Sequence, residues 1–235
     1  MTDAAAEPGL RERKKQRTRR HIADTARRLF AERGFEQVTV AEIAREAEVA
    51  QATVFNYFPT KEDLFYSRLE AFEEELLSAI RERRPGQSVL AAFAEFLLGQ
   101  GGVLAMQAPG GDDEATARIR TITRIIVDSP ALLARERQVF DHYAKTLAAR
   151  LAEDVGAAAD DVVCQVVANT LLGLHRALID HVRAMALAGA TAAQIRRDVR
   201  RQARRAVAQL EEGLGDFGKS RSGRLTRLRS PPDNF

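Results

Sequence analysis

The sequence predicts an all-α protein. Ala, Leu, Arg and Glu dominate its 235 residues, and alternation of β-branched with polar residues is nearly absent. Apolar residues instead recur every three to four positions over most of the chain, which is the spacing of one face of an α-helix. They make up 45% of the composition, enough to bury a sizeable core in one large or two smaller domains.

Composition also narrows the class of protein. The only cysteine, Cys164, cannot form an internal disulfide, so we expect a small buried side chain in a reducing cytoplasm. No apolar region follows the first basic residues, and no run of about 18 apolar residues occurs. We therefore expect neither a signal peptide nor a membrane span.

Charge is unevenly distributed. The net charge is +3, but two segments are strongly cationic: RERKKQRTRR at Arg11–Arg20 and KSRSGRLTRLR at Lys219–Arg229. Such segments favour a polyanionic partner, either nucleic acid or an acidic membrane surface. For the first segment this interpretation is favoured over a solubilising tail, because a helix follows at once. For the second segment both interpretations stay open.

Three helices are expected near the N-terminus. The first covers roughly residues 13–32, with apolar side chains at helical spacing, and Gly34 follows it as a C′ residue. Thr39 and Glu42 have the spacing of a capping box, which predicts a second helix over roughly residues 40–47. A tight turn leads to a third helix over roughly residues 51–58, which Pro59 ends.

Longer helices are expected after this region. Thr60, with Asp63 at position N3, should cap a helix of about 20 residues. Others are expected from about residue 90, over 115–127, from 130 to about 154, over 160–188 and over 191–212, with Gly- and Pro-rich loops between them. The helix over 160–188 is apolar on more than one face, and a second copy of the chain would cover the extra surface. Residues 1–12 and 214–235 are expected to be disordered.

The second and third helices have the proportions of a helix-turn-helix motif, whose second helix enters the major groove of DNA. Gln can pair with adenine through its amide, and Ala and Thr offer methyl groups to thymine. Val54, Phe55 and Phe58 are expected to anchor the opposite face. Other polar side chains have the chemistry to contact phosphates. The expected DNA contacts are Arg17, Thr39, Gln51, Ala52, Thr53, Asn56, Tyr57 and Lys61.

The segment Ile22–Phe65 resembles the DNA-binding domain of the TetR family of bacterial transcriptional regulators. Its turn departs from the family pattern Gly-Val-Ser, because Glu48, Val49 and Ala50 stand there. We therefore expect a turn geometry at Glu48 that ordinary residues adopt, and a third helix without an N-cap hydroxyl. The matching features are Ala26–Phe30 (Ala-x-x-Leu-Phe), Gly34–Phe35, Thr39–Val40, Ile43–Ala44, Val49, Thr53–Phe55, Tyr57–Phe58 and Lys61–Glu62.

The resemblance implies a helix-turn-helix DNA-binding domain over residues 13–60 and a helical ligand-binding and dimerisation domain over residues 61–213. It also implies a homodimer formed through the last two helices, a palindromic double-stranded DNA operator, and repression relieved by a small-molecule effector. No cofactor is expected. The alternative is a DNA-binding dimer that senses no small molecule.

The effector is expected to be hydrophobic, such as an acyl-CoA, a fatty acid or a hydrophobic drug, because such ligands suit an apolar cavity with a few polar groups. Ordinary core packing is the favoured interpretation for most of the candidate residues, the aromatic ones in particular. For His175 and His181, a satisfied hydrogen bond is favoured over contact with a ligand or metal, and for Arg176 an internal salt bridge is favoured. The candidates are Phe93, Phe96, Met106, Ile122, Ile126, Phe140, Tyr143, Asn169, Leu172, His175 and Arg176.

Catalysis has little support. None of the four histidines has a Glu three residues before it, as the di-iron sites of helical bundles require. No G-x-S-x-G motif and no Walker-type loop occur. We expect neither catalytic residues nor a metal site. A protein that binds membrane surfaces through its basic ends is the remaining alternative.

Overall fold

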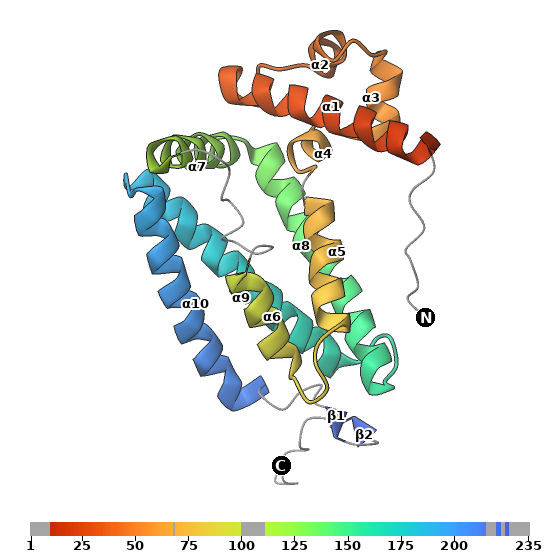
Figure 1. The fold of residues 1–235 in the computed structure, drawn as a ribbon, viewed down its shortest axis with the longest axis vertical. Coiled ribbons are helices and arrows are strands. Elements are labelled where there is room, and N and C mark those ends of the chain that lie inside the picture. Colours follow the sequence, from red (N-terminus) through yellow and green to blue (C-terminus); the bar gives the residue numbers. More distant parts are fainter. Residues whose placement is uncertain (1–9, 68, 100–110, 215–219, 222–223, 226–235) are drawn as a thin grey trace. The chain divides into compact units, whose positions relative to one another are not determined.

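A computed structural model describes residues 10–67, 69–99, 111–214, 220–221 and 224–225. The all-α prediction is confirmed (Figure 1). The chain forms two compact units. We call residues 10–67 with 125–133 the head, and the remaining described residues the body. The helices are α1 (Leu10–Arg33), α2 (Val40–Glu46), α3 (Gln51–Tyr57), α4 (Lys61–Phe65), α5 (Leu69–Arg81), α6 (Val89–Leu98), α7 (Asp112–Val127), α8 (Pro130–Val155), α9 (Val162–Leu187) and α10 (Ala192–Leu214).

The head is built around a small apolar core that α1, α2, α3 and α4 share. Its aromatic centre is Phe30, whose ring lies 5.1 Å from that of Phe35 and 5.9 Å from that of Phe65. Burying this surface fixes the angle at which α3 leaves the core. The almost completely buried side chains include Ile22, Leu29, Phe30, Ile43, Val54, Phe58 and Leu64.

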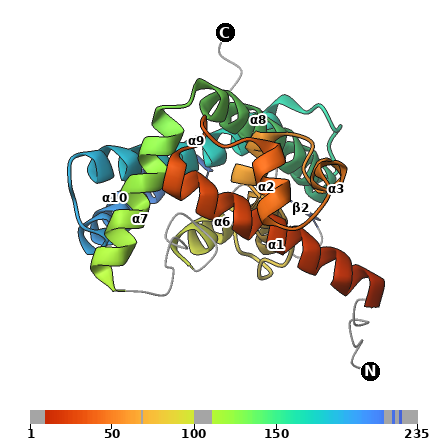
Figure 2. The same ribbon diagram turned by 90° about the horizontal axis from the view of Figure 1, so that it is seen from above.

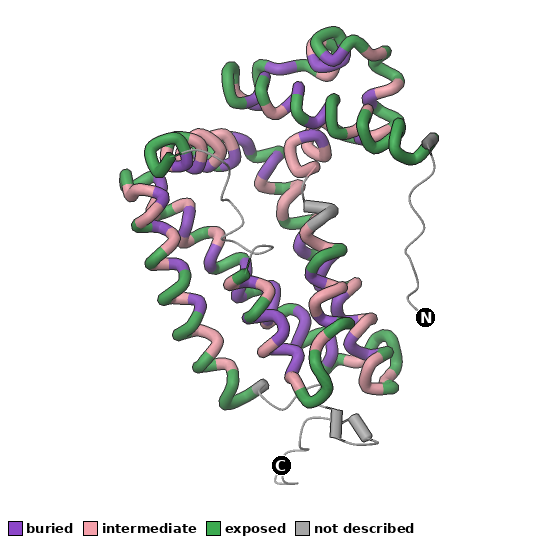
Figure 3. The backbone as a smooth tube through the Cα atoms, in the orientation of Figure 1, coloured by how far each residue is buried: buried purple, intermediate pink, exposed green. Residues whose placement is uncertain are grey.

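Local signals set most of the helix ends in the head. The predicted capping box at Thr39–Glu42 is present, and the predicted cap at Thr60 forms a second capping box with Asp63. Gly34 adopts φ +82° directly after α1. Helix α1 begins at Leu10, earlier than predicted, so the first cationic segment is helical. Its N-terminal turns extend past α2 and α3 in both views (Figures 1 and 2) and are largely exposed (Figure 3).

The corner between α7 and α8 also belongs to the head. The buried Ser129 hydroxyl donates to the Glu36 carboxylate at 2.6 Å, and the Tyr66 hydroxyl donates to the Leu132 carbonyl at 3.2 Å. Tyr66 is also where the predicted fourth helix breaks. Its φ of −89° and ψ of 17° end α4, and α5 begins at Leu69. The predicted single long helix is therefore two helices.

In the body, α9 is the central helix. Helix α10 packs along α9 and α6, and α5 packs against α6. By length and composition α9 is the one described helix that would be able to cross a membrane, but it is the core helix of the body. Arg183 of α9 forms a nearly buried ion pair with Glu136 of α8, through contacts of 2.9 and 2.5 Å. The buried residues are spread along the whole of α9, including Cys164, Val167, Leu171, Leu174, Leu178 and Val182.

Helix α9 also carries apolar side chains that the body leaves uncovered. Val162 is 69% exposed and Val166 56%, and Val163 and Leu187 are exposed as well. This confirms the prediction that its apolar surface extends over more than one face. In the segment predicted to be disordered, β1 (Ser220–Arg221) pairs antiparallel with β2 (Arg224–Leu225). The rest of both predicted disordered ends, apart from residues 10–12 and Leu214 in helices, lies outside the described residues.

The prediction of an ordinary turn geometry at Glu48 is wrong. Glu48 has φ +53°, in the left-handed region that glycine favours. The amide of Val49 donates to the carbonyl of Ala44 and that of Glu48 to Arg45, at 2.9 and 3.1 Å. These two bonds form a Schellman motif that ends α2. The motif requires a left-handed residue at C′, so the turn keeps the geometry although the side chain is glutamate.

Replacing Glu48 with glycine should stabilise the protein. A left-handed conformation costs a residue with a Cβ about 1–2 kcal/mol, and glycine's extra flexibility in the unfolded chain offsets about 0.5–1 kcal/mol of that. We expect Glu48→Gly to raise the free energy of unfolding by about 0.5–1 kcal/mol in urea titrations. Ala41→Gly, at an exposed helical position of α2, is the control and should lower it by about 1 kcal/mol. A loss of stability in Glu48→Gly would contradict this account of the turn.

Candidate nucleic-acid interface

Helix α3 presents two different faces. Val54 and Phe58 are buried in the head, whereas Gln51, Ala52 and Asn56 are exposed. Thr53 and Tyr57 are half-buried at the border between the faces. The leading edge of α3 is therefore open to solvent, as a helix that enters the major groove requires. Ala50 caps α3 without a side-chain hydrogen bond, which confirms the predicted lack of an N-cap hydroxyl.

Phe55 does not anchor α3 in the head, and that prediction is wrong. The residue is 45% exposed. The reason is the register of the short helix: Val54 and Phe58, four residues apart, form the inner stripe, and Phe55 lies on the outer face with Gln51. Nothing in the sequence decides between the two assignments, because the three apolar residues are close together.

Lys61 has structural partners in the head. Its ammonium group donates to the carbonyls of Phe35 and Val38 at 3.0 and 3.2 Å, and lies 4.1 Å from the centre of the Phe35 ring. A lysine has three N–H donors, so one remains for a phosphate oxygen. The structure therefore gives Lys61 a role in holding the loop between α1 and α2. The predicted DNA contact stays a prediction.

Besides Tyr57 on α3, the other predicted phosphate contacts lie on α1 and at the start of α2. Thr39 is exposed, and its hydroxyl and amide both bond the Glu42 side chain. The hydrogen bonds from Thr39 hold the pKa of Glu42 below its ordinary value. Arg17 is exposed on α1, and the guanidinium of Arg19 lies 4.7 Å above the Phe58 ring. Cationic side chains of α1 and the reading face of α3 thus belong to the same compact unit.

A second candidate site lies in the body, where aromatic side chains from α5, α6, α8 and α9 meet. We call Phe72, Phe96, Phe140, Tyr143 and His175 the aromatic cluster. Phe72 is at its centre, with ring centroids 4.5 Å from His175, 5.3 Å from Phe96 and 6.0 Å from Tyr143. Four of the five residues are among the predicted pocket residues. Phe72 is not, because its spacing is equally typical of an ordinary core stripe.

His175 is the polar group of this cluster. It is 3% exposed, and its Nδ1 atom has no hydrogen-bond partner in the part of the chain that the structure describes. The hydrogen bond favoured from sequence is thus wrong for this residue. Burial lowers the pKa of His175 to about 3, so the ring is neutral. A buried nitrogen without a partner costs about 1–3 kcal/mol, which a ligand that supplies a partner would recover.

The remaining predicted pocket residues are dispersed. Phe93 and Leu172 are part of the body's core, whereas Ile126 belongs to the head and Ile122 is half-buried on α7. Asn169 and Arg176 are wrong as pocket residues, because they lie on the solvent side of α9. Asn169 donates to the carbonyl of Gln165 on the same helix. Met106 lies outside the described residues.

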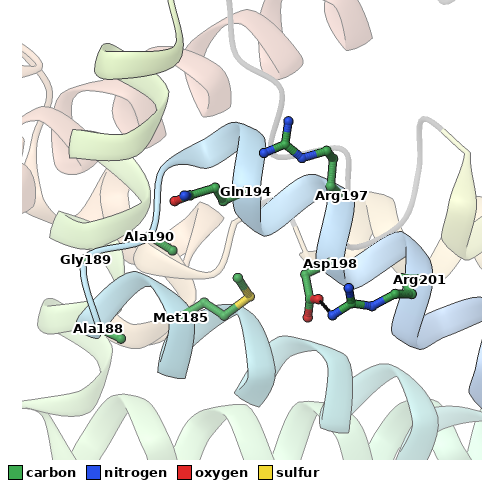
Figure 4. Close-up of a pocket in the computed structure, with 8 residues that line it drawn as sticks. All are labelled: Met185, Ala188, Gly189, Ala190, Gln194, Arg197, Asp198 and Arg201. Atoms are coloured by element: carbon green, nitrogen blue, oxygen red, sulfur yellow. Dashed lines mark hydrogen bonds and ion pairs between the residues drawn. The ribbon is translucent and has the colours of Figure 1, made fainter.

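An open hollow of about 640 Å³ lies where α9 turns into α10 (Figure 4). Two of its charged groups, Asp198 and Arg201, already pair with each other. Asp198 contacts Arg201, and it lies 2.6 Å from Nε2 of His181, which confirms a satisfied hydrogen bond for that histidine. The same hydrogen bond lowers the pKa of Asp198. This hollow does not fit an apolar effector. The described residues hold no group of three or more side chains suited to a metal ion.

Comparisons with known proteins agree with this geometry. Residues 22–67 match the family model of bacterial regulatory proteins, tetR family, and residues 102–216 match the MftR C-terminal domain. The chain is 28% identical over 176 residues to the mycofactocin biosynthesis transcriptional regulator MftR of Mycobacterium tuberculosis, covering 72% of this chain and 81% of MftR. It is 33% identical over 153 residues to the HTH-type transcriptional regulator TcmR of Streptomyces glaucescens, covering 63% of this chain and 66% of TcmR.

The fold has a counterpart among solved structures. Salmonella enterica GusR superposes with a TM-score of 0.51 at 20% identity, over 84% of this chain and 95% of GusR. MftR and TcmR are both named as regulators of transcription and not as enzymes.

The neutral state of His175 predicts how stability depends on pH. Its folded pKa of about 3 is below the ordinary value of 6.5, so between these values the unfolded chain binds a proton that the folded protein does not. This contribution to stability is therefore complete above pH 6.5 and is lost as the pH falls. We expect a loss of about 1–2 kcal/mol between pH 7 and pH 5 in urea titrations.

His175→Phe should remove this pH dependence and keep the aromatic packing. It should also raise stability at pH 7 by about 1 kcal/mol, because the unpartnered nitrogen is gone. His142→Phe, at a histidine that is 68% exposed, is the matched control and should leave the pH dependence unchanged. An identical pH profile in wild type and His175→Phe would show that this ring is not the buried neutral group.

Proposed function

The chain belongs to the tetR family of transcriptional regulators, and we propose that it represses transcription in the cytoplasm by binding a palindromic operator as a homodimer. We further propose that a small hydrophobic effector releases it from DNA. The observation that carries the proposal is the open face of α3, where Gln51, Ala52 and Asn56 are exposed while Val54 and Phe58 hold the helix in the head.

The residue types on α3 suit the reading of base pairs. The amide of Gln51 can donate to and accept from adenine in the major groove, and the methyl of Thr53 can contact thymine. Tyr57 stands at the border of the face, where its hydroxyl suits a phosphate oxygen. Exposed cations along the N-terminal half of α1, such as Arg17, add an attraction that weakens with salt.

The exposed apolar residues of α9 favour a second copy of the chain as the partner. Val162 and Val166 of this helix leave apolar surface in water that a self-complementary interface would bury. Helix α10 is less suited to face its own copy, because its exposed side carries a row of like charges: Arg197, Arg200, Arg201, Arg204 and Arg205. In a dimer with two-fold symmetry the two α3 helices would read half-sites roughly 34–36 Å apart.

The aromatic cluster is the proposed effector site. Its rings supply apolar contact, and the neutral His175 supplies one unpartnered nitrogen that a ligand can hydrogen-bond. Acyl-CoAs, fatty acids and hydrophobic drugs are the classes we propose. The alternative is a DNA-binding dimer that senses nothing, in which the cluster is only core. Ligand binding that leaves operator affinity unchanged would favour that alternative.

Substitutions in α3 should separate the reading of bases from the contacts to phosphate. After selection of bound sequences from a random duplex pool, we expect a palindrome. Gln51→Ala should weaken the free energy of binding to the selected site by about 1–3 kcal/mol. It should also relax the base preference at one position in each half-site. Tyr57→Phe should weaken binding to all DNA sequences by the same factor. Gln138→Ala, a glutamine exposed on α8, is the control and should change neither property. Unchanged affinity and preference in both α3 variants would refute the proposed docking of this helix.

The effector role predicts a coupled response. A panel of acyl-CoAs, fatty acids and hydrophobic drugs, tested by thermal shift, should contain compounds that raise the melting temperature and release a fluorescent operator duplex. We expect His175→Phe to weaken the binding of hits that carry a hydrogen-bonding group. Asn169→Ala, on the solvent side of α9, should not. Hits that stabilise the protein and leave it on DNA would count against an inducer.

A further inference from the structure

Phe55 differs from the other phenylalanines of α1–α3 and the loop between them in its exposure to solvent. Phe30, Phe35 and Phe58 are buried, whereas Phe55 is 45% exposed. It takes part in none of the ring–ring contacts among the described residues. A scattered exposed apolar side chain is common on a protein surface. This one lies in the middle of the face that the proposed function places against DNA.

The position of Phe55 relative to Gln51 indicates which base pair its ring would contact in the major groove. Gln51 is four residues before it, so both side chains lie on the same face of α3. Four residues of helix rise about 6 Å, and successive base pairs rise 3.4 Å. A helix lying along the groove therefore places Phe55 about two base pairs from the base that Gln51 contacts. Ala52 and Asn56 form the row beside them.

We propose that Phe55 selects a thymine by packing against its C5-methyl group, about two base pairs from the adenine that Gln51 reads. The methyl group of thymine is the apolar group that the major groove displays, and cytosine, adenine and guanine present polar atoms there. A phenyl ring has no hydrogen-bonding group, so it cannot bond a phosphate oxygen. Packing the ring against a polar base edge would weaken binding, because the edge would lose water without gaining a hydrogen bond. The proposal rests on the proposed operator binding and names a residue that sets its sequence preference.

The expected size of the effect follows from the area that one methyl group buries. Burying one methyl-sized group is worth about a fourfold change in affinity. Each half-site contributes one such contact in a dimer, so removing both methyl groups should weaken binding about 16-fold. The effect is smaller than the loss of a base pair's hydrogen bonds, and it is confined to one position in each half-site.

Deoxyuridine tests the contact directly, because it differs from thymidine only by the C5-methyl group. The full-length protein is titrated with the selected operator and with duplexes in which each thymine pair related by the two-fold axis is replaced by deoxyuridine. Anisotropy of a labelled duplex gives the affinities. In the wild type we expect deoxyuridine at one symmetric pair of positions to lower the affinity about 16-fold. In Phe55→Ala the affinity for the thymine operator should fall, and the same replacement should then have no effect.

Two controls separate this contact from a structural role. Asn56→Ala, next to Phe55 on the same exposed edge, should keep the full response to deoxyuridine. Melting temperature and sedimentation of Phe55→Ala should match the wild type, because the ring supports neither the head's core nor a contact between copies. A change in oligomeric state would overturn the proposal by showing that the ring is covered by a second copy.

The remaining outcomes are distinct. If the wild type binds the operator but no deoxyuridine position lowers its affinity, the proposal fails and the proposed function stands. The same holds if Phe55→Ala keeps the full deoxyuridine response. If the wild type enriches no sequence from the random pool, operator binding itself fails, and the assignment of Phe55 fails with it.

Discussion

The candidate DNA interface depends on the burial of one stripe of a short helix. Helix α3 has only seven residues, too few to be stable alone, so its position comes from Val54 and Phe58 in the core of the head. Those two contacts orient everything else on α3. They place Gln51, Ala52, Phe55 and Asn56 outward together, and a slip of the buried stripe by one residue would turn a different set toward DNA.

Around that stripe the head is held by contacts between distant segments. Lys61 links the start of α4 to the loop before α2, Arg19 of α1 lies over Phe58, and Ser129 bonds Glu36. The last of these comes from the corner between α7 and α8, whose helices otherwise belong to the body. The head is thus completed by residues far along the chain, and a change in the α7–α8 corner would act on the unit that carries α3.

The body shows a different balance between stability and function. Its core is continuous and mostly aliphatic, yet it holds a neutral histidine whose Nδ1 has no partner among the described residues. A purely structural core would gain from phenylalanine at that position. Buried polar groups left unsatisfied are the places where a native fold departs from maximal stability, and such departures concentrate at functional sites. The aromatic rings around His175 are consistent with a site for a hydrophobic molecule.

The sequence alone determined the features that depend on nearby residues. The all-α fold, the two capping boxes, the end of α1 at Gly34 and the helix-turn-helix spacing all follow from interactions between positions three to five residues apart. Only the tertiary structure decided the exposure of Phe55, the partners of Lys61, the break at Tyr66 and the isolation of His175. Each of these depends on which distant segments occupy the space around a side chain, and no local pattern records that. Glu48 differs from these four: its side chain indicated an ordinary turn, but the local Schellman hydrogen bonds that end α2 require a left-handed backbone at this position.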